Sequence, residues 1–396
     1  MAEKLIPNIT TNSVADLRAI LDEYGVAILE DYFGNKYADT VFNSVVKWMV
    51  ELDIGLTLDI KTWKNSNLPM GPRYGMYQSI VSNAPVFWEL REKFYPIFSE
   101  LLGETELITS IDGASIFPTI HSPKGKPDWA HIDQTISSDF MCYQAQFVSS
   151  DTTASFVCTP GSHSEHKNLL KKFGISGSGN WYKFTDDNIV ELRQMFGDAY
   201  QIPIIARKGS IIFWDSRTIH SAKYPNVKEN KWRGVFYISM RAKSSHSDES
   251  LATIQKAVRE GLTTNHWGGK IFKPVDRFNQ KNSKVKTLTA NPQSLSIYRT
   301  LNPLQRKLCG FDDWKMVLTL EPEDNMRDEC LYILDLCDNL KPYQKQELGL
   351  FIKSTNKFNL KKILLMLGKF YCGRDKIATI MNFIKDQEKE KVMVEV

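Results

Sequence analysis

The chain has 396 residues, 42% of them hydrophobic and 24% charged, and a formal net charge of +4 at pH 7. This composition is typical of a globular protein and excludes a disordered or fibrous chain. The small net charge gives no indication of a nucleic-acid partner. No apolar run reaches the roughly 18 residues of a membrane span, and the N-terminus lacks the apolar core of a signal peptide. We therefore expect an intracellular, cytoplasmic protein.

The N-terminal part of the chain is predicted to be mainly helical. Residues 13–30 indicate a helix that ends at Gly25 and is followed by a buried strand, VAIL. Residues 36–52 and 84–102 predict two further amphipathic helices. Between them, residues 60–80 are rich in proline and glycine, which indicates a surface loop or a lid over a site.

The pattern then changes to short strands separated by turns. The candidate strands are 106–117, 129–135, 141–150, 154–160, 200–206, 209–216 and 234–243. Many short strands of this kind predict a sandwich or barrel, and a helical insert at 165–196 interrupts them. Helices followed by a strand-rich body predict the α+β class, with helices packed on a β core.

The C-terminal part returns to helix. Residues 248–262 predict a helix, and residues 263–280 are expected to be extended and irregular. From about residue 288 the chain is predicted to be all helical, with helices at 292–311, 326–340, 342–354, 359–371 and 375–391. We place a domain boundary near residue 285, which gives a domain at 1–285 and a helical region at 286–396.

The end of this helical region is basic, and the cysteines show no pairing pattern. Residues 340–396 contain 12 Lys and Arg against 6 Asp and Glu. Such helices could contact a partner or form a dimer, although a plain solvated face is the commoner explanation. The six cysteines include no CxxC pair, so we expect free, packed thiols.

The stretch WAHIDQ at 129–134 carries the first candidate chemistry. Residues two apart in a strand point to the same face, so the imidazole of His131 and the carboxylate of Asp133 project together. They are two members of a 2-His-1-carboxylate triad, which holds non-haem Fe(II) and leaves positions open for other ligands. Because His-x-Asp also occurs by chance, a third ligand must come from elsewhere in the chain.

The candidate third ligand is His220, in the segment KGSIIFWDSRTIH. It follows the apolar strand core IIFW, which would place it at the mouth of a barrel. His163 and His166, in TPGSHSEH, are rivals because a spacing of three on a helix can chelate a metal. Ligation by that pair would leave His220 and the segment after it without an explanation.

Polar residues on neighbouring strands could hold a dicarboxylate cosubstrate. Arg233 opens the strand RGVFYISM, and an arginine can pair with a carboxylate in bidentate fashion. Arg217 is the rival anchor, and its alternative explanation is a salt bridge with Asp215. Gln144 and Gln146 alternate onto one face of their strand, where we expect hydrogen bonds to the cosubstrate.

Taken in order, these motifs resemble the phytanoyl-CoA dioxygenase family of Fe(II)/2-oxoglutarate oxygenases. The matching blocks are WAHIDQ at 129–134, TPGSH at 159–163, the segment 208–220 and Arg233. The segments SIDGASIF and REGLTTNHW are also similar to those of an uncharacterised branch of that family. The resemblance covers about residues 15–275 and is specific as a set, while each block alone is weak.

The resemblance implies a double-stranded β-helix, or jelly roll, with His131, Asp133 and His220 on iron and Arg233 on the C5 carboxylate of 2-oxoglutarate. It also implies that O2 and 2-oxoglutarate are consumed, with succinate and CO2 as products. Related halogenases have a small residue in place of the carboxylate ligand. Since Asp133 fills that place, the expected outcome is hydroxylation of an unactivated C–H bond.

Two other functions remain open at this point. The chain could be a catalytically silent jelly-roll protein that binds a partner through its basic helical tail, or a cupin-like barrel that holds Mn or Zn. The substrate, a small molecule or an acyl compound, is not indicated by any motif. Substrate contacts are expected from residues 60–80, the insert 165–196 and the region His266–Lys270.

Overall fold

The computed structural model divides the chain into two compact units, residues 1–312 and 313–396. The boundary expected near residue 285 stays a prediction; the segment up to residue 312 groups with the first unit. The structure describes residues 8–68, 76–77, 80–119, 129–137, 142–150, 156–177, 181–222, 232–272, 281–314, 327, 330–331, 334, 337, 340–355, 363, 366–367 and 380–381.

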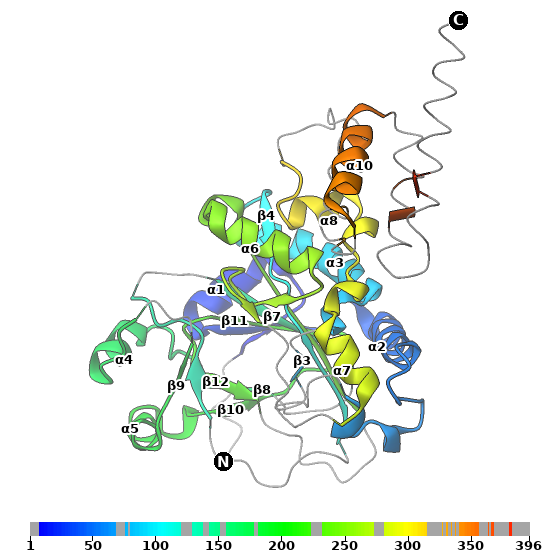
Figure 1. Ribbon diagram of the computed structural model, residues 1–396. Helices are drawn as coiled ribbons and strands as arrows, with labels where there is room; N and C mark the ends of the chain where they lie inside the picture. The colour runs from blue at the N-terminus through cyan, green and yellow to red at the C-terminus, as the bar shows by residue number, and fades with distance from the viewer. Residues whose placement is uncertain are drawn as a thin grey trace, which may run out of the picture. The chain divides into compact units, whose positions relative to one another are not determined.

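The predicted N-terminal helices are confirmed (Figure 1). They are α1 (Val14–Tyr24), α2 (Gly34–Glu51) and α3 (Pro85–Leu102), and the strand β2 (Val26–Leu29) follows α1. Gly25 ends α1 with a φ of 68°, a left-handed conformation that glycine adopts without steric cost. Short 3-10 turns at Ile60–Thr62, Asn65–Asn67 and Val81–Asn83 lie between α2 and α3. Part of the expected loop or lid, 69–75 and 78–79, lies outside the described residues.

Within the described residues, an eight-stranded sheet forms the larger layer of the first unit. Its order is β1-β2-β11-β7-β13-β5-β3, and β4 pairs with β13. Apart from β2, its strands are β1 (Thr10–Thr11), β3 (Met76–Tyr77), β4 (Leu107–Thr109), β5 (Ala114–Pro118), β7 (Tyr143–Val148), β11 (Ile211–Asp215) and β13 (Trp232–Ala242). The pairings are antiparallel except that of β1 with β2.

A five-stranded antiparallel sheet of the described residues forms the second layer. Its order is β10-β8-β12-β6-β9. The strands are β6 (His131–Ile132), β8 (Phe156–Cys158), β9 (Tyr182–Lys183), β10 (Ile202–Ile204) and β12 (His220–Ala222). The predicted strands of the β body are therefore all present, and the α+β class is confirmed.

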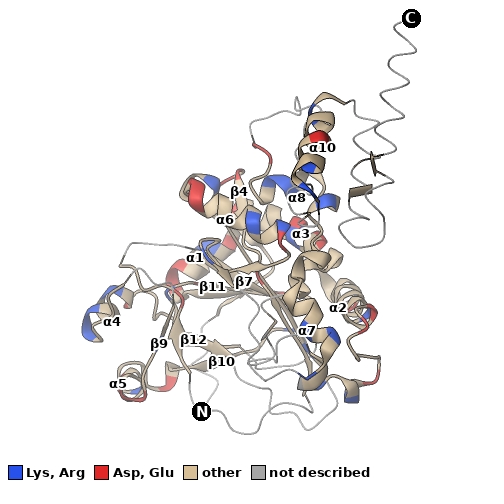
Figure 2. Cartoon of the chain, in the orientation of Figure 1, with Lys and Arg blue, Asp and Glu red and all other residues tan. Residues whose placement is uncertain are grey.

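The two sheets pack face to face around a shared apolar core. Val148, Ile212 and Val235 of the large sheet belong to the same buried cluster as Phe156 and Cys158 of the small sheet. The large sheet is buried on both faces, as strand β7 shows. Its side chains alternate, so that one set faces the small sheet and the other set faces the helices. Figure 2 shows that charged residues lie mainly on the helices, while the central strands carry few of them.

Aromatic side chains fill the opposite face of the large sheet, against the N-terminal helices. The ring of Phe147 on β7 packs against Phe94 of α3, and the ring of Phe213 on β11 packs against Phe98. Phe236 of β13 likewise meets Phe87. Large rings of this kind bury much apolar surface, so α3 anchors the helical layer on the sheet.

The predicted insert and the helix after the β body are also confirmed. The insert contains α4 (His166–Lys172) and α5 (Asp186–Phe196), and the later helix is α6 (Asp248–Arg259). The extended segment that follows forms a hairpin-like pair, β14 (Thr263–Thr264) with β15 (Ile271–Phe272).

The helix expected over residues 292–311 is broken into short pieces. They are the 3-10 turns Pro292–Leu295 and Tyr298–Thr300 and the helix α8 (Pro303–Leu308), after α7 (Ser283–Ala290). Pro292 and Pro303 begin two of them, because proline fits the first turn of a helix but cannot continue one.

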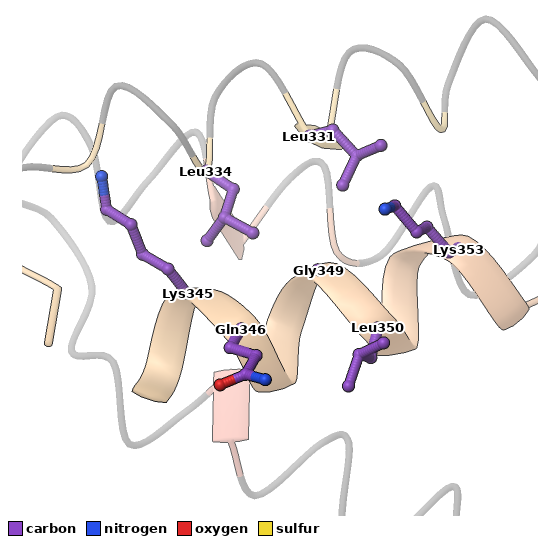
Figure 3. Close-up of a pocket in the computed structure, with 7 residues that line it drawn as sticks. All are labelled: Leu331, Leu334, Lys345, Gln346, Gly349, Leu350 and Lys353. Carbon is purple, nitrogen blue, oxygen red and sulfur yellow. The ribbon is translucent and has the colours of Figure 1, made fainter. Parts of the chain in front are cut away.

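In the second unit, α10 (Pro342–Ser354) is confirmed over its predicted range, and it packs its buried residues Leu348, Phe351 and Ile352 into an apolar cluster. A pocket of about 350 Å³ lies beside α10 (Figure 3). It is lined by Leu331, Leu334, Lys345, Gln346, Gly349, Leu350 and Lys353. The predicted helices 359–371 and 375–391 lie almost wholly outside the described residues.

Two predictions about the whole chain can be compared with the structure. The cysteines at 142, 158, 309, 330 and 337 are free and buried, as expected, and Cys372 lies outside the described residues. Over the described part of the chain, no helix is both long and apolar enough to cross a membrane.

The two glycine C-caps Gly25 and Gly103 give a matched test of the packing at the end of α1. Both have a positive φ, so alanine at either position costs about 1 kcal/mol for the backbone. A β-carbon at Gly103 meets nothing within 4 Å, whereas one at Gly25 lies 2.5 Å from Thr218 Oγ1 and closer still to His163 Nδ1. Gly25→Ala should therefore cost about 2–4 kcal/mol in total. Urea unfolding curves giving equal midpoints for the two variants would contradict this packing.

Candidate metal centre

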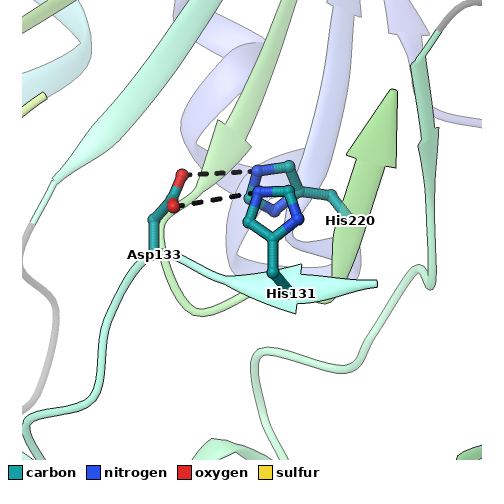
Figure 4. Close-up of side chains that lie close together, drawn as sticks. All are labelled: His131, Asp133 and His220. Carbon is teal, nitrogen blue, oxygen red and sulfur yellow. Dashed lines mark ion pairs between the residues drawn. The ribbon is translucent and has the colours of Figure 1, made fainter. Parts of the chain in front are cut away.

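Three side chains converge between the two sheets (Figure 4). Strands β6 and β12 are antiparallel, and His131 lies directly opposite His220. Asp133 follows His131 by two residues and turns its carboxylate toward both rings. One possible ligand atom from each residue lies within 4.8 Å of the others, and all three side chains are buried. The structure therefore brings the predicted triad together.

The backbone fixes how the two imidazoles are turned. His131 Nδ1 lies 3.2 Å from the carbonyl oxygen of Trp129, and His220 Nδ1 lies 2.9 Å from that of Thr218. A carbonyl oxygen only accepts, so each Nδ1 carries a hydrogen and donates it. The Nε2 atoms face Asp133, at 3.3 Å from Oδ2 for His220 and 3.9 Å from Oδ1 for His131. This arrangement directs both Nε2 atoms to the same point, as metal-binding histidines require.

Charges in the cluster suit the binding of a cation. Burial raises the pKa of Asp133, but the hydrogen bond to His220 and the nearby imidazoles outweigh burial and hold this pKa below its usual range. Burial and the neighbouring His220 lower the pKa of His131 to about 3. At neutral pH Asp133 is an anion and His131 is a neutral imidazole, the form that binds a metal.

The segment that carries Asp133 is held from several sides. Gln144 Nε2 of β7 donates to Asp133 Oδ2 at 2.9 Å, so the large sheet reaches the triad of the small sheet. The backbone N–H of Asp133 donates to the carbonyl oxygen of Ser216 at 3.0 Å. Gln134 Oε1 accepts a hydrogen bond from Ser216 Oγ at 2.8 Å. Gln134 therefore secures the turn between the sheets, while Gln144 contacts the carboxylate itself.

Arg233 is buried and has no carboxylate partner among the described residues. Its side chain is 2% exposed. Nη2 donates to the hydroxyl of Tyr237 at 3.3 Å, but within the described structure Nε and Nη1 have no hydrogen-bond partner. The register of β13 with β7 pairs Tyr237 with Gln146, whose buried Oε1 also has no partner in the described part. A buried cation without a counter-ion is costly, which is characteristic of a site for an anion.

Arg217, the rival anchor, already has a carboxylate partner. Its Nε and Nη2 donate to the two oxygens of Asp215 at 2.9 and 2.7 Å. Its backbone N–H also donates to Asp215 Oδ1 at 2.8 Å. The salt bridge considered as the alternative explanation is therefore present.

The rival histidines lie elsewhere. His163 Nε2 contacts the carbonyl oxygen of Asp22 in α1 at 3.1 Å. His166 Nε2 contacts the carbonyl oxygen of Gln134 at 2.9 Å. Within the described part of the chain, neither residue joins the group that could hold a metal.

A fourth histidine lies beside the triad, although the sequence identified its region only as a place for substrate contacts. His266 Nε2 is 3.5 Å from Asp133 Oδ2, and its Nδ1 is 2.8 Å from Asp112 Oδ2. Burial lowers the pKa of His266, but Asp112 and Asp133 raise it overall to about 9. Asp112 and His266 are 154 residues apart, and no spacing rule connects them.

Comparisons with known proteins give similarity of structure only. No model of a known protein family matches the chain, and no curated protein sequence matches it significantly. A protein from Salmonella typhimurium LT2, described as a candidate oxidoreductase, is similar with a TM-score of 0.48 at 13% identity, over 78% of this chain and 87% of its own.

Two further solved structures contain ligands. EctD from S. alaskensis, with bound Fe, has a TM-score of 0.41 at 15% identity and covers 63% of this chain and 84% of its own. The epimerase SnoN, in complex with Fe3+, alpha ketoglutarate and nogalamycin RO, has a TM-score of 0.36 at 15% identity. The similarity covers 58% of this chain and 83% of the SnoN chain. All these TM-scores are below 0.5, so the resemblance to the phytanoyl-CoA dioxygenase family stays a prediction.

Comparing two buried arginines tests whether the guanidinium of Arg233 lacks a stabilising partner. Arg233→Met should raise the free energy of unfolding of the metal-free protein by about 1–3 kcal/mol, because it removes an unpaired buried cation. Arg91 is equally buried, but it donates to the carbonyl oxygens of Ser82 and Asp112 and lies over the ring of Phe87. Arg91→Met should therefore lower the same free energy by about 2 kcal/mol or more. Denaturant unfolding would contradict this if both variants were destabilised alike.

Proposed function

We propose that the protein is an Fe(II)- and 2-oxoglutarate-dependent oxygenase of the phytanoyl-CoA dioxygenase family, which hydroxylates an unactivated C–H bond. The observation that carries the proposal is the buried group His131, Asp133 and His220, whose ligand atoms converge from two paired strands. Two imidazoles and one carboxylate are the ligand set of non-haem Fe(II) oxygenases. Mn and Zn accept some of the same ligands, and the experiments below separate them.

The residues present fit the metal and the cosubstrate. The Nδ1 atoms of His131 and His220 are engaged by backbone carbonyls, which leaves Nε2 of each ring to the metal. The carboxylate of Asp133 supplies the one negative charge of the set. When bound, the metal with 2-oxoglutarate and O2 would supply the oxidising chemistry, with succinate and CO2 as co-products. The protein's own part is to bind, orient and exclude water.

Arg233 fits the far carboxylate of 2-oxoglutarate better than Arg217 does. It is buried on the strand next to β7, and two of its guanidinium nitrogens lack partners in the described structure. Arg217 is occupied by Asp215 on two nitrogens. The hydroxyl of Tyr237 and the amide of Gln146, which face each other in register, are placed to line the same interior.

The strand order supports a double-stranded β-helix as the architecture. From β5 to β8 and again from β10 to β13, successive strands alternate between layers: β5, β7, β11 and β13 belong to the large sheet, while β6, β8, β10 and β12 belong to the small one. Strand β9, in the insert, also pairs into the small sheet. Such alternation winds the chain around two facing sheets, as in a jelly roll. The two proposed histidine ligands then lie on neighbouring strands of the small sheet, and Asp133 lies just after one of them.

Asp133 also bears on the product. In related halogenases a small residue replaces the carboxylate so that a halide can bind the metal. The carboxylate of Asp133 faces both imidazoles and receives a hydrogen bond from Gln144. We therefore propose hydroxylation, and a chlorinated product formed in the presence of chloride would contradict it.

The proposed activity predicts turnover of the cosubstrate even without a known substrate. Purified protein with Fe(II), 2-oxoglutarate and O2 should form succinate by uncoupled turnover, and His131→Ala should reduce this at least about 100-fold by removing a metal ligand. An anaerobic titration with Fe(II) and 2-oxoglutarate should give a visible charge-transfer band. If neither metal nor 2-oxoglutarate binds, a silent binding protein is favoured, and binding of Mn or Zn without turnover favours a different metal protein.

The two arginines can be separated by the affinity for 2-oxoglutarate. Arg233→Met should weaken 2-oxoglutarate binding about 100-fold, because a buried charge-assisted pair contributes about 3 kcal/mol. Arg217→Met removes a cation that is bound to Asp215, so its 2-oxoglutarate affinity should stay within about threefold of wild type. The charge-transfer band serves as readout, and the reverse pattern would make Arg217 the anchor.

A further inference from the structure

His266 reaches the triad from a part of the chain outside the two facing sheets. It lies between β14 and β15, just before Trp267, in the segment that follows α6. Its Nε2 approaches Oδ2 of Asp133 at 3.5 Å, and its side chain is 25% exposed while that of Asp133 is 6% exposed. The ring therefore lies at the edge of the buried cluster and faces its carboxylate.

His266 is not a fourth member of the metal-binding group. The three atoms that lie within 4.8 Å of one another come from His131, Asp133 and His220, and among the described residues His266 does not join them. It contacts two carboxylates, those of Asp133 and Asp112. Its Nδ1 hydrogen-bonds to Asp112, and its Nε2 faces Asp133 at ion-pair distance.

Asp112 fixes the direction of this ring. Asp112 Oδ2 accepts from His266 Nδ1 at 2.8 Å and from Ser110 Oγ at 2.9 Å. Ser110 Oγ in turn accepts from the backbone N–H of Ser239 in β13 at 3.2 Å. Nη2 of the buried Arg91 donates to the carbonyl oxygen of Asp112 at 3.2 Å. Asp112 is thus tied both to the large sheet and to α3.

The segment that carries His266 is also joined to the segment that carries Asp112. The backbone N–H of Thr264 donates to the carbonyl oxygen of Ile111 at 3.0 Å, and the N–H of Ile111 donates to Thr264 Oγ1 at 3.0 Å. Asn265 Oδ1 accepts from the backbone N–H groups of Gly269 and Lys270 and closes the turn after His266. With both neighbours held, the ring has little freedom to turn away from Asp133.

We propose, on the basis of the function proposed above, that His266 is a positioning residue for the metal ligand Asp133. It and Gln144 Nε2 approach the same oxygen, Oδ2, and Gln144 does so at 2.9 Å. These two contacts hold the carboxylate plane of Asp133 toward the triad imidazoles. Asp112 accepts from Nδ1 of the same ring and so fixes the direction in which Nε2 faces Asp133.

Two amide variants separate the two contacts of His266. A glutamine amide can reach the place of Nε2 and face Asp133, whereas an asparagine amide can reach the place of Nδ1 and keeps only the contact with Asp112. His266→Asn should weaken Mn(II) binding about 10–100-fold, the usual effect of removing a partner of a metal ligand. His266→Gln should stay within about threefold of wild type. Free Mn(II), measured by electron paramagnetic resonance during titration, gives these affinities without any turnover.

The controls separate positioning from folding. His246→Asn changes another partly buried histidine, whose Nδ1 lies 2.9 Å from Ser250 Oγ, and should leave Mn(II) affinity unchanged. Melting curves of the metal-free variants report the fold. Equal Mn(II) affinity of wild type and His266→Asn overturns the proposal, and so does equal weakening in both amide variants with lowered melting temperatures.

The outcome for His266 can be separated from the outcome for the proposed oxygenase function. If wild type binds Mn(II) and the amide variants differ as expected, but no succinate forms with Fe(II), the positioning role stands and the oxygenase function does not. If wild type binds no metal, both proposals are overturned.

Discussion

The pairing of β6 with β12 is the interaction on which the site depends. It sets His131 opposite His220, and Asp133 follows just after β6, where its hydrogen bonds with Ser216 and Gln144 hold it beside both rings. A slip of one residue would turn the side chains of one strand to the other face of the small sheet. The register is secured on both sides, because β12 also pairs with β8 and β6 with β9. The strand register of the small sheet therefore determines how His131, Asp133 and His220 face one another.

The interior between the sheets combines an apolar core with a few buried polar groups that lack a hydrogen-bond partner within the described part of the chain. Val235 and Val148 continue the core on the same strands that carry Arg233, Gln144 and Gln146. Buried polar groups normally have partners, so unpaired ones reduce stability and indicate where a ligand acts. The comparison between Arg233 and Arg91 shows the difference: both are buried, but only Arg91 has its charge shared by backbone oxygens and aromatic rings.

Much of this arrangement could be predicted from the sequence, because it follows from local periodicity. The helices α1 to α3, the strands of the β body and the pair His131 and Asp133 each depend on spacing within a few residues. His220 could be predicted because it directly follows an apolar strand. The contact of His266 with Asp112 could not, since it joins segments 154 residues apart. The broken helix before residue 312 was missed because apolar spacing was given more weight than Pro292 and Pro303.

The place of β2 in the large sheet determines when the protein can finish folding. β2 is made early, but one of its neighbours, β11, begins only at Ile211. The hydrogen bond between Thr218 and Gly25 likewise joins residues 193 positions apart. Contacts this distant in the chain form slowly and leave apolar surface exposed meanwhile. On the ribosome, β2 therefore cannot complete its pairing in the large sheet until the chain has been made beyond β11.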